Sequence, residues 1–234
     1  MKQSLLFSML SFALLGGTAL AEGDHAHAVD QDGAILSKAD PSKVAAFDIL
    51  GAYAQRKGNV VTFHMTTNGA AGAARPEASG NLGGSSVLSY VWPTSLDPSV
   101  VGFEGKTGIL AMTATNHPDF DDTPLNDENG DGDPANDGGI WHSHWVVLVP
   151  DNACGKGNLK VKDIPHGKKP KMPKTWPGLP IFIDSPGYNF SMKESEVLVR
   201  VPLKEVGFPK HFNFDGVTAG LRVNQQVHAP LLCV

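Results

Sequence analysis

Short runs in which hydrophobic and polar residues alternate recur along the chain. Between Asn59 and Thr66, Val61, Phe63 and Met65 fall on one side of an extended strand, and mostly polar residues fall on the other. Segments rich in Gly and Pro separate these runs, which is typical of a sandwich or barrel of short strands. The strands predicted in this way are Phe47 to Tyr53, Asn59 to Thr66, Ser86 to Trp92, Thr107 to Thr115, Ile140 to Val149, Ile181 to Ile183, Glu196 to Pro202 and Thr218 to Val223.

Three long connections lie between these strands, at 68–84, 117–139 and 165–180. Loops of this length without their own periodicity are uncommon in a compact domain and are usually functional or ordered by a ligand. Helical periodicity is limited to one candidate turn at 41–46, and there is no internal repeat or linker. We therefore expect an all-β, antiparallel β-sandwich of immunoglobulin-like or jelly-roll kind. It would form a single domain at 47–234 after a flexible N-terminal segment at 22–46.

The first 21 residues have the features of a secretory signal peptide. Lys2 supplies the positive end, an apolar run follows from Leu5 to Leu15, and Ala19 to Ala21 gives a small-x-small cleavage site. The apolar run is shorter than the roughly 20 residues that span a bilayer. We expect cleavage after Ala21, a periplasmic or secreted protein, and no membrane insertion after cleavage.

The net charge argues against one class of partner, and the cysteine count predicts a disulfide. The chain has 19 basic and 24 acidic residues, a net charge of −5, which argues against a nucleic-acid partner. An even pair of cysteines in an oxidising compartment indicates a disulfide between Cys154 and Cys233. Free thiols or thiolate metal ligands are the alternatives, but neither cysteine has a His or Cys neighbour at ligand spacing.

The connection at 117–139 contains the sequence DENGDGD, which places oxygen-bearing side chains at alternate positions. Such spacing, with glycines between, is how a short loop wraps a hard cation, so we predict a structural Ca²⁺. The predicted ligands are Asp127, Asn129, Asp131, Asp133 and Asp137.

The first seven residues of this loop resemble the calcium loops of EF-hands and dockerins. Gly138, however, stands at the twelfth position, where that pattern has a bidentate Glu. Asp137 or an upstream carboxylate of Asp119, Asp121 or Asp122 would have to close the site. No Lys or Arg lies between Asp119 and Asp137 to offset the charge. The alternative is a solvated acidic turn, because DG and NG steps are ordinary turn sequences.

The strand that follows, IWHSHWVVLV, carries two histidines on one face. His142 and His144 are two positions apart, about 7 Å between Cα atoms, so both imidazoles can reach one Zn²⁺ or Cu²⁺. We take His64 as the third ligand of this transition-metal site. Sequence leaves other choices open, namely His117, His166, His211, His228, Met65 or a loop carboxylate. Ordinary hydrogen-bonded strand histidines are the alternative interpretation.

Two short segments resemble known families. His-x-His-Trp within Trp141 to Trp145 resembles the zinc strand of α-type carbonic anhydrases, although that family's other landmarks are not found; the resemblance implies a zinc-dependent enzyme. The segment Phe47 to Gly69 resembles the opening hairpin of DOMON-type β-sandwiches, secreted modules that bind haem or sugars. It implies haem with Met65 and either His142 or His144 as axial ligands, whereas Met65 also fits a plain core position.

These patterns favour an exported, non-enzymatic metal-binding protein whose partners are metal ions or a small ligand. It would carry a calcium loop and a His-based transition-metal or ligand site. A zinc-dependent enzyme and a haem-binding module are the alternatives.

Overall fold

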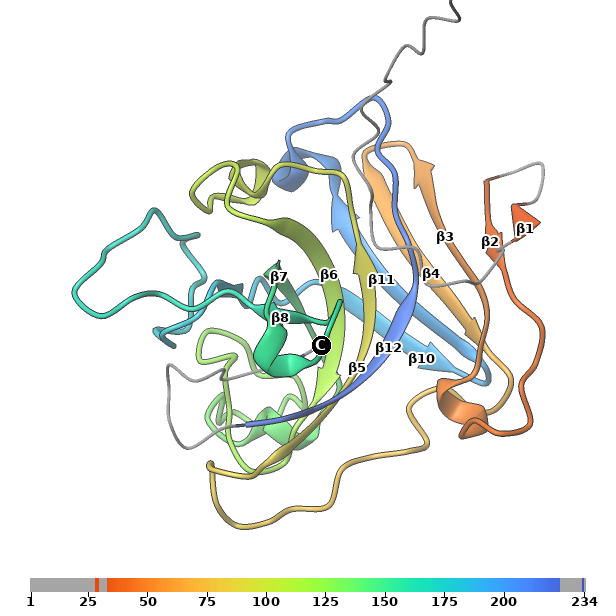
Figure 1. The fold of residues 1–234 in the computed structure, drawn as a ribbon, viewed down its shortest axis with the longest axis horizontal. Coiled ribbons are helices and arrows are strands. Elements are labelled where there is room, and N and C mark those ends of the chain that lie inside the picture. The colour runs from red at the N-terminus through yellow and green to blue at the C-terminus, as the bar shows by residue number, and fades with distance from the viewer. Residues whose placement is uncertain (1–27, 30–32, 224–232, 234) are drawn as a thin grey trace, which may run out of the picture.

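The structure is a computed structural model that describes residues 28–29, 33–223 and 233. Within these residues, two antiparallel β-sheets pack face to face, and only short 3-10 helices interrupt the connections (Figure 1). The prediction of an all-β sandwich is confirmed, and every predicted strand overlaps an observed one. The predicted signal peptide, residues 1–21, lies outside the described residues.

The first sheet has the strand order β1-β2-β3-β4-β11-β10. Its central strand β4 is the alternating segment of the sequence, and burial alternates along it residue by residue. The two short strands β1 and β2 extend the sheet beyond β3, so part of the segment expected to be flexible pairs within the sheet. The bounds are Ala28–Val29 (β1), Ile35–Leu36 (β2), Ile49–Lys57 (β3), Val60–Thr67 (β4), Asn189–Lys193 (β10) and Glu196–Pro202 (β11).

The second sheet has the order β12-β5-β6-β7-β8, with β9 pairing β7 as well. The two strands β6 and β7 form a hairpin around the acidic connection at 117–139, with Thr115 opposite His142 and Ile109 opposite Leu148. The bounds are Ser86–Pro93 (β5), Ile109–Asn116 (β6), His142–Pro150 (β7), Leu159–Val161 (β8), Ile183–Asp184 (β9) and Val217–Arg222 (β12).

The 3-10 helices are single turns within the connections. The helix η1 lies near the turn that the sequence predicts at 41–46, and η3 lies at the end of the acidic connection. Their bounds are Ala45–Phe47 (η1), Pro98–Val101 (η2), Asp137–Gly139 (η3), Asn152–Cys154 (η4) and Leu203–Val206 (η5).

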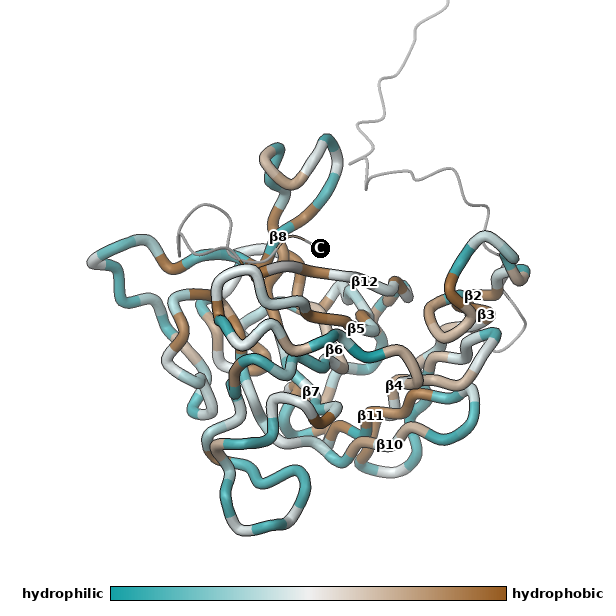
Figure 2. Tube along the Cα trace, turned by 90° about the horizontal axis from the view of Figure 1, so that it is seen from below, coloured by the Kyte–Doolittle hydropathy of each residue, from teal (hydrophilic) through white to brown (hydrophobic). Residues whose placement is uncertain are grey.

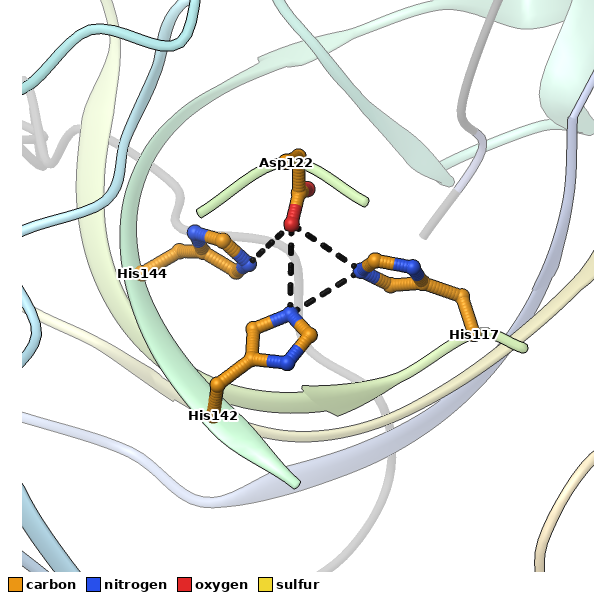
Figure 3. A group of neighbouring side chains, drawn as sticks. All are labelled: His117, Asp122, His142 and His144. Atoms are coloured by element: carbon orange, nitrogen blue, oxygen red, sulfur yellow. Dashed lines mark hydrogen bonds and ion pairs between the residues drawn. The ribbon is translucent and has the colours of Figure 1, made fainter. Parts of the chain in front are cut away.

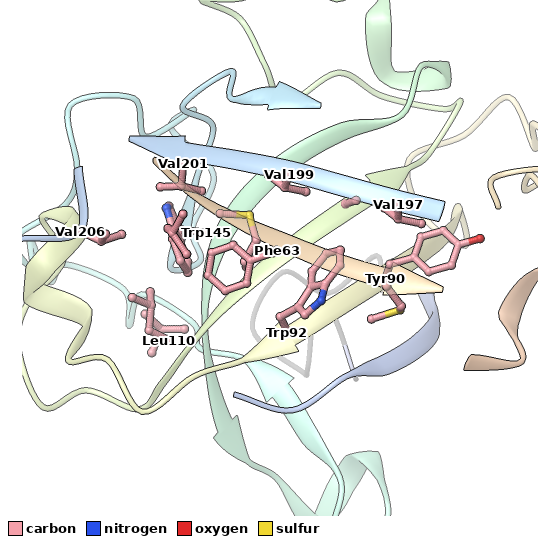
Figure 4. Packing of buried hydrophobic residues seen from close by; sticks show 14 of the residues in the cluster. Phe63, Tyr90, Trp92, Leu110, Trp145, Val197, Val199, Val201 and Val206 are labelled. Carbon is pink, nitrogen blue, oxygen red and sulfur yellow. The ribbon is translucent and has the colours of Figure 1, made fainter. Parts of the chain in front are cut away.

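The main core fills the space between the two sheets. Phe63 from β4 meets Trp145 from β7 edge-to-face, with ring centroids 5.8 Å apart (Figure 4). The indole N–H of Trp92 donates to the backbone oxygen of His64 at 2.9 Å and so links the sheets through a part-buried hydrogen bond. Figure 2 shows hydrophobic positions gathered along the paired strands and hydrophilic ones along the protruding loops. Burial of these large aromatic side chains is the main stabilising contribution to the sandwich.

A second apolar cluster lies on the other face of the second sheet. Strand alternation sends Trp145 and Val147 of β7 into the main core, whereas Val146 and Leu148 join this second cluster. The second sheet is thus buried on both faces. Consequently His142 and His144, which share the face of Val146, project away from the first sheet.

The structure contains the disulfide predicted between Cys154 and Cys233, with Cα atoms 5.4 Å apart. It joins Cys233 to η4, next to the edge strand β8. In the part of the chain that the structure describes, no helix has the length and apolarity needed to cross a membrane.

Candidate metal centre

The β6–β7 hairpin brings a third histidine to the His142–His144 pair. Because Thr115 lies opposite His142, the chain leaves β6 at Asn116 beside the start of β7. His117 is the next residue, and its Nε2 lies 3.0 Å from Nε2 of His142. The backbone N–H of His117 donates to the oxygen of Gly138 at 2.9 Å, which closes the hairpin at this point.

Asp122 joins the three histidines from the turn that follows His117. Its Oδ1 lies 3.2 Å from the Nε2 atoms of His117, His142 and His144 alike (Figure 3). The turn is held by Asp121, whose carboxylate accepts from the backbone N–H of Thr123 and from that of Asp137, each at 2.7 Å. The neighbouring Asp121 thus fixes the backbone from which Asp122 reaches the cluster.

The four donor residues are buried almost completely. Their exposed fractions are 2% for His117, 4% for Asp122, 2% for His142 and 1% for His144. All four ligand atoms lie within 4.8 Å of one another. Burial of this kind requires each polar atom to have a partner, because water is excluded.

Each imidazole is oriented by a hydrogen bond from its Nδ1. His117 donates to the oxygen of Phe120 at 3.0 Å, and His142 donates to the oxygen of Ile140 at 2.8 Å. The Nδ1 of His144 lies 3.2 Å from the oxygen of Asp184 and 3.1 Å from Oγ of Ser185. A carbonyl oxygen can only accept, so each Nδ1 carries a proton, and each ring in its neutral form presents a lone pair at Nε2.

Ser185 couples this outer layer of hydrogen bonds to the carboxylate. Its hydroxyl donates to the backbone oxygen of Asp122 at 2.6 Å while lying within reach of the His144 ring. One side chain therefore positions two donor residues, one from the connection at 117–139 and one from strand β7. Such hydrogen bonds behind the ligands are the usual way in which metal sites fix the tautomer and ring orientation.

Three lone pairs and one carboxylate oxygen consequently face a common point. Among the described residues, Oδ1 of Asp122 and Nε2 of His144 have no hydrogen-bond partner. A buried polar atom without a partner costs about 1–3 kcal/mol. A single proton could satisfy only one of these contacts, whereas one cation at the centre satisfies all four.

Spacing of the donor atoms matches a small metal ion. For Zn²⁺ with ligand distances of about 2.0–2.1 Å, neighbouring donors of a tetrahedron lie about 3.3–3.4 Å apart. The observed separations are 3.2 Å from Asp122 to each ring and 3.0 Å between His117 and His142. The cluster thus has the donor types of a four-coordinate transition-metal site, four of its six donor pairs have the matching spacing, and all six lie within 4.8 Å.

The pKa values of the residues in the cluster are shifted in different directions. Burial lowers the pKa of His117, but the Asp122 carboxylate outweighs burial, so that the net pKa lies above its ordinary value. Burial keeps the pKa of His142 below its ordinary value. Burial also opposes ionisation of Asp122, but the surrounding imidazoles hold its pKa well below the usual range. Asp122 is therefore the fixed negative charge of the site.

The structure brings two of the three histidines predicted from sequence together and places the third elsewhere. His142 and His144 lie together in the cluster, but His64 lies on the outer face of the first sheet. Because Phe63 and Met65 point into the core, strand alternation turns His64 away from the second sheet, where its ring stacks on Tyr53 at 4.1 Å. The third histidine of the cluster is His117, which sequence analysis left among several alternatives.

Met65 is a core residue with no exposed surface. It packs between the sheets, whereas His142 and His144 project from the opposite face of the second sheet. The sheet itself separates the sulfur from both imidazoles. The structure therefore does not bring Met65 and either histidine together as axial ligands of one haem.

The acidic stretch 127–133 lies beside the cluster and is folded by its own side chains. The carboxylate of Asp127 accepts from the backbone N–H groups of Gly130, Asp131 and Gly132 at 2.6, 3.2 and 2.8 Å. Asn129 bonds the side chain of Asp131 at 3.1 Å. These contacts are those of a capped turn. Calcium binding here stays a prediction.

Asp137, the fifth calcium ligand predicted from sequence, is fully buried next to the His117–Asp122–His142–His144 cluster. One of its oxygens accepts from the backbone N–H of Glu128 at 2.8 Å, and its own N–H donates to Asp121. It thereby fastens the end of the acidic loop to the turn that carries Asp122.

From the sequence, Asp122 was named only as one of the carboxylates that could close the calcium loop, although a loop carboxylate was also left open as a ligand of the histidine site. A usable signal was present. If the predicted strands Thr107 to Thr115 and Ile140 to Val149 pair as a hairpin, the first loop residues must lie beside His142. His117 lies two positions after the end of the first of these strands, and Asp122 lies seven positions after it.

Comparison with known proteins adds no relative to this description. No protein-family model matches the chain. No curated protein and no solved structure matches it either. The interpretation of the His117–Asp122–His142–His144 cluster consequently depends on its geometry and chemistry.

Proposed function

We propose that the protein binds one transition-metal ion, Zn²⁺ or Cu²⁺, through His117, Asp122, His142 and His144. The observation that carries the proposal is the convergence of four buried donor atoms, with 3.0–3.2 Å between the pairs described above. Imidazole nitrogen with a single carboxylate oxygen is a donor set that suits zinc and copper.

The donor count favours binding over catalysis. Structural zinc sites are closed by four protein ligands, whereas catalytic sites keep one position for water. Asp122 occupies the fourth position of this cluster, so zinc held here would have a complete tetrahedral set. We therefore favour a metal-binding protein, in which the ion joins the β6–β7 hairpin to the turn at 117–123, over a zinc hydrolase.

We also propose that the protein is exported from the cytoplasm. The sequence features of residues 1–21 support it, and the disulfide between Cys154 and Cys233 fits an oxidising compartment. A calcium ion in the acidic loop is a separate proposal, supported by the donor spacing at 127–133 alone.

The test is metal stoichiometry in matched histidine variants. Protein without a histidine tag would be stripped with chelator, reloaded with Zn²⁺ or Cu²⁺, and analysed by elemental mass spectrometry. We expect one ion per chain in the wild type and in His64→Ala, and a loss of affinity in His117→Ala of at least about tenfold, the lower end of the cost of removing even a residue that only positions a ligand. Retention of the ion by His117→Ala, or its loss in His64→Ala, would overturn the assignment.

Thermal unfolding gives a second readout of the same site. A ligand at about 100 times its Kd stabilises the folded state by about 2.7 kcal/mol. Wild type and His64→Ala should gain this stabilisation on adding the metal, whereas His117→Ala should not. A variant that merely unfolds would show a low Tm with and without metal, which separates a folding defect from loss of the site.

A further inference from the structure

A small cavity borders the proposed metal centre on the outer face of the second sheet. Its volume is about 40 Å³. One water molecule needs about 10–15 Å³ of cavity volume, so the cavity has room for about two or three heavy atoms. Most of its wall is apolar and comes from neighbouring strands, as with Val91 of β5, Val146 of β7 and Leu221 of β12.

Three of the four metal donors take part in this wall. His117, Asp122 and His144 line the cavity, and His142 does not. The cavity therefore adjoins the face of the donor tetrahedron that is opposite His142. An additional ligand entering from the cavity would approach the metal through that face and raise its coordination number to five. Zinc expands in this way in some sites, and Cu²⁺ favours more than four ligands in tetragonal geometries.

Thr115 contributes a second, independent observation. It lines the same cavity, it is 7% exposed, and its Oγ1 has no hydrogen-bond partner within the described ranges. Buried hydroxyl groups are nearly always hydrogen-bonded in folded proteins, so one without a partner in a cavity wall indicates a missing ligand atom or water. Thr115 is the cross-strand neighbour of His142 in the β6–β7 pairing, so this hydroxyl is close to the metal centre.

We infer that the cavity binds a small uncharged molecule of about two or three heavy atoms, which coordinates the metal on the side opposite His142. Its bound or neighbouring atom would accept a hydrogen bond from the Thr115 hydroxyl. The apolar wall disfavours an anion, because a charge buried beside Val91 and Val146 would lose most of its hydration, and the Asp122 carboxylate in the same wall would repel it. This inference rests on the proposed metal site and adds to it the class of exchangeable ligand.

Nitric oxide is a suitable probe, since it is uncharged, has two heavy atoms, and gives an electron paramagnetic resonance signal of spin 3/2 when bound to Fe²⁺. The protein would be loaded with Fe²⁺ without oxygen and its metal content measured before nitric oxide is added. We expect the signal in the wild type. Val146→Phe, which fills the cavity, should abolish it at unchanged iron content, and Val146→Ala, which enlarges the cavity, should retain it.

The hydroxyl is tested by the isosteric change Thr115→Val. Loss of one hydrogen bond predicts a nitric oxide affinity about two- to tenfold weaker at unchanged iron content. The matched control is Thr62→Val in β4, which belongs to the other sheet and should not alter the affinity. Azide is the charged comparison and should bind at least about tenfold more weakly than nitric oxide, because its charge must be desolvated.

The two proposals fail in different ways. A wild-type protein that takes up one zinc ion but shows no nitric oxide signal when loaded with iron overturns the ligand site alone. An unchanged signal in Val146→Phe would overturn the assignment of the ligand to the cavity. Equal affinity in Thr115→Val would overturn the hydrogen bond from the hydroxyl, and azide binding as strong as nitric oxide would overturn the uncharged class of ligand. Absence of stoichiometric uptake of any metal overturns the metal site and the ligand site together.

Discussion

Gly138 packs directly against the carbonyl oxygen of Phe120, so closely that a side chain on Gly138 would overlap that oxygen. The same residue accepts a backbone hydrogen bond from His117 at 2.9 Å. Gly138 is thus the point where the end of the acidic loop presses on the turn that carries His117 and Asp122. The glycine at this position is explained by close packing and not by the geometry of an EF-hand loop.

Gly138→Ala should weaken metal binding. The added methyl group must push the turn of Phe120 outward, which displaces His117 and costs on the order of tenfold to 100-fold in affinity, the range for residues that position ligands. Titration of Zn²⁺ against a competing chelator measures this change. The control is Gly139→Ala, because a methyl group there would meet Pro118 at an ordinary distance of 3.9 Å. Equal loss in both variants would refute the positioning role of Gly138.

Ser185→Ala should also reduce metal affinity, by about tenfold to 100-fold. The serine hydroxyl donates to the backbone of Asp122 and lies 3.1 Å from Nδ1 of His144, so its removal loosens two donors. Ser143→Ala is the matched control on β7, since the Ser143 hydroxyl is buried without a hydrogen-bond partner in the described structure. If the two substitutions change affinity equally, the effect is one of general packing.

Metal binding should release protons near neutral pH. The pKa of His117 is raised above its ordinary value, since the Asp122 carboxylate outweighs the effect of burial. A metal must displace the proton that this ring holds, so affinity declines as pH falls through the raised pKa. The decline should begin at a higher pH than for an ordinary histidine, whose pKa is about 6.5.

Calorimetry in buffers with different ionisation enthalpies measures this proton release. The apparent binding enthalpy at neutral pH should depend on the buffer in the wild type and equally in His64→Ala. A binding enthalpy independent of buffer would mean that the site takes up metal without displacing a proton.

Calcium binding by the acidic loop is testable separately from the transition-metal site. If calcium orders the loop, adding it to metal-stripped protein should raise the Tm, and the double substitution Asp131→Asn with Asp133→Asn should remove the effect without changing zinc content. The carboxylate of Asp127 already accepts three backbone N–H groups. A Tm that does not respond to calcium would therefore identify the loop as a turn stabilised by Asp127.

Strand positions and faces could be predicted because a strand imposes a period of two residues on its sequence. The alternation of residues in the strand around Trp145 predicted that His142 and His144 share a face. Burial of Trp145 in the main core and of Val146 in the second cluster agrees with this. Both properties depend on local spacing.

The position of His64 shows the limit of such reasoning. Alternation in β4 correctly puts Met65 in the core, and it therefore puts His64 on the outer face of its sheet. Sequence could not show that this face lies on the far side of the sandwich from His142, because that depends on how the sheets stack. Choosing among the remaining histidines needs the same information.

The amino-acid sequence by itself determined the all-β class, the cysteine pair, and a strand with two histidines on one face. The tertiary structure decided which residues complete the cluster, because His117 and Asp122 reach it only after β6 and β7 pair and Gly138 closes on Phe120. The physical reason is that a metal site is specified by distances of a few ångströms between donors. In this chain those distances arise from hairpin register and loop packing, which periodicity does not encode.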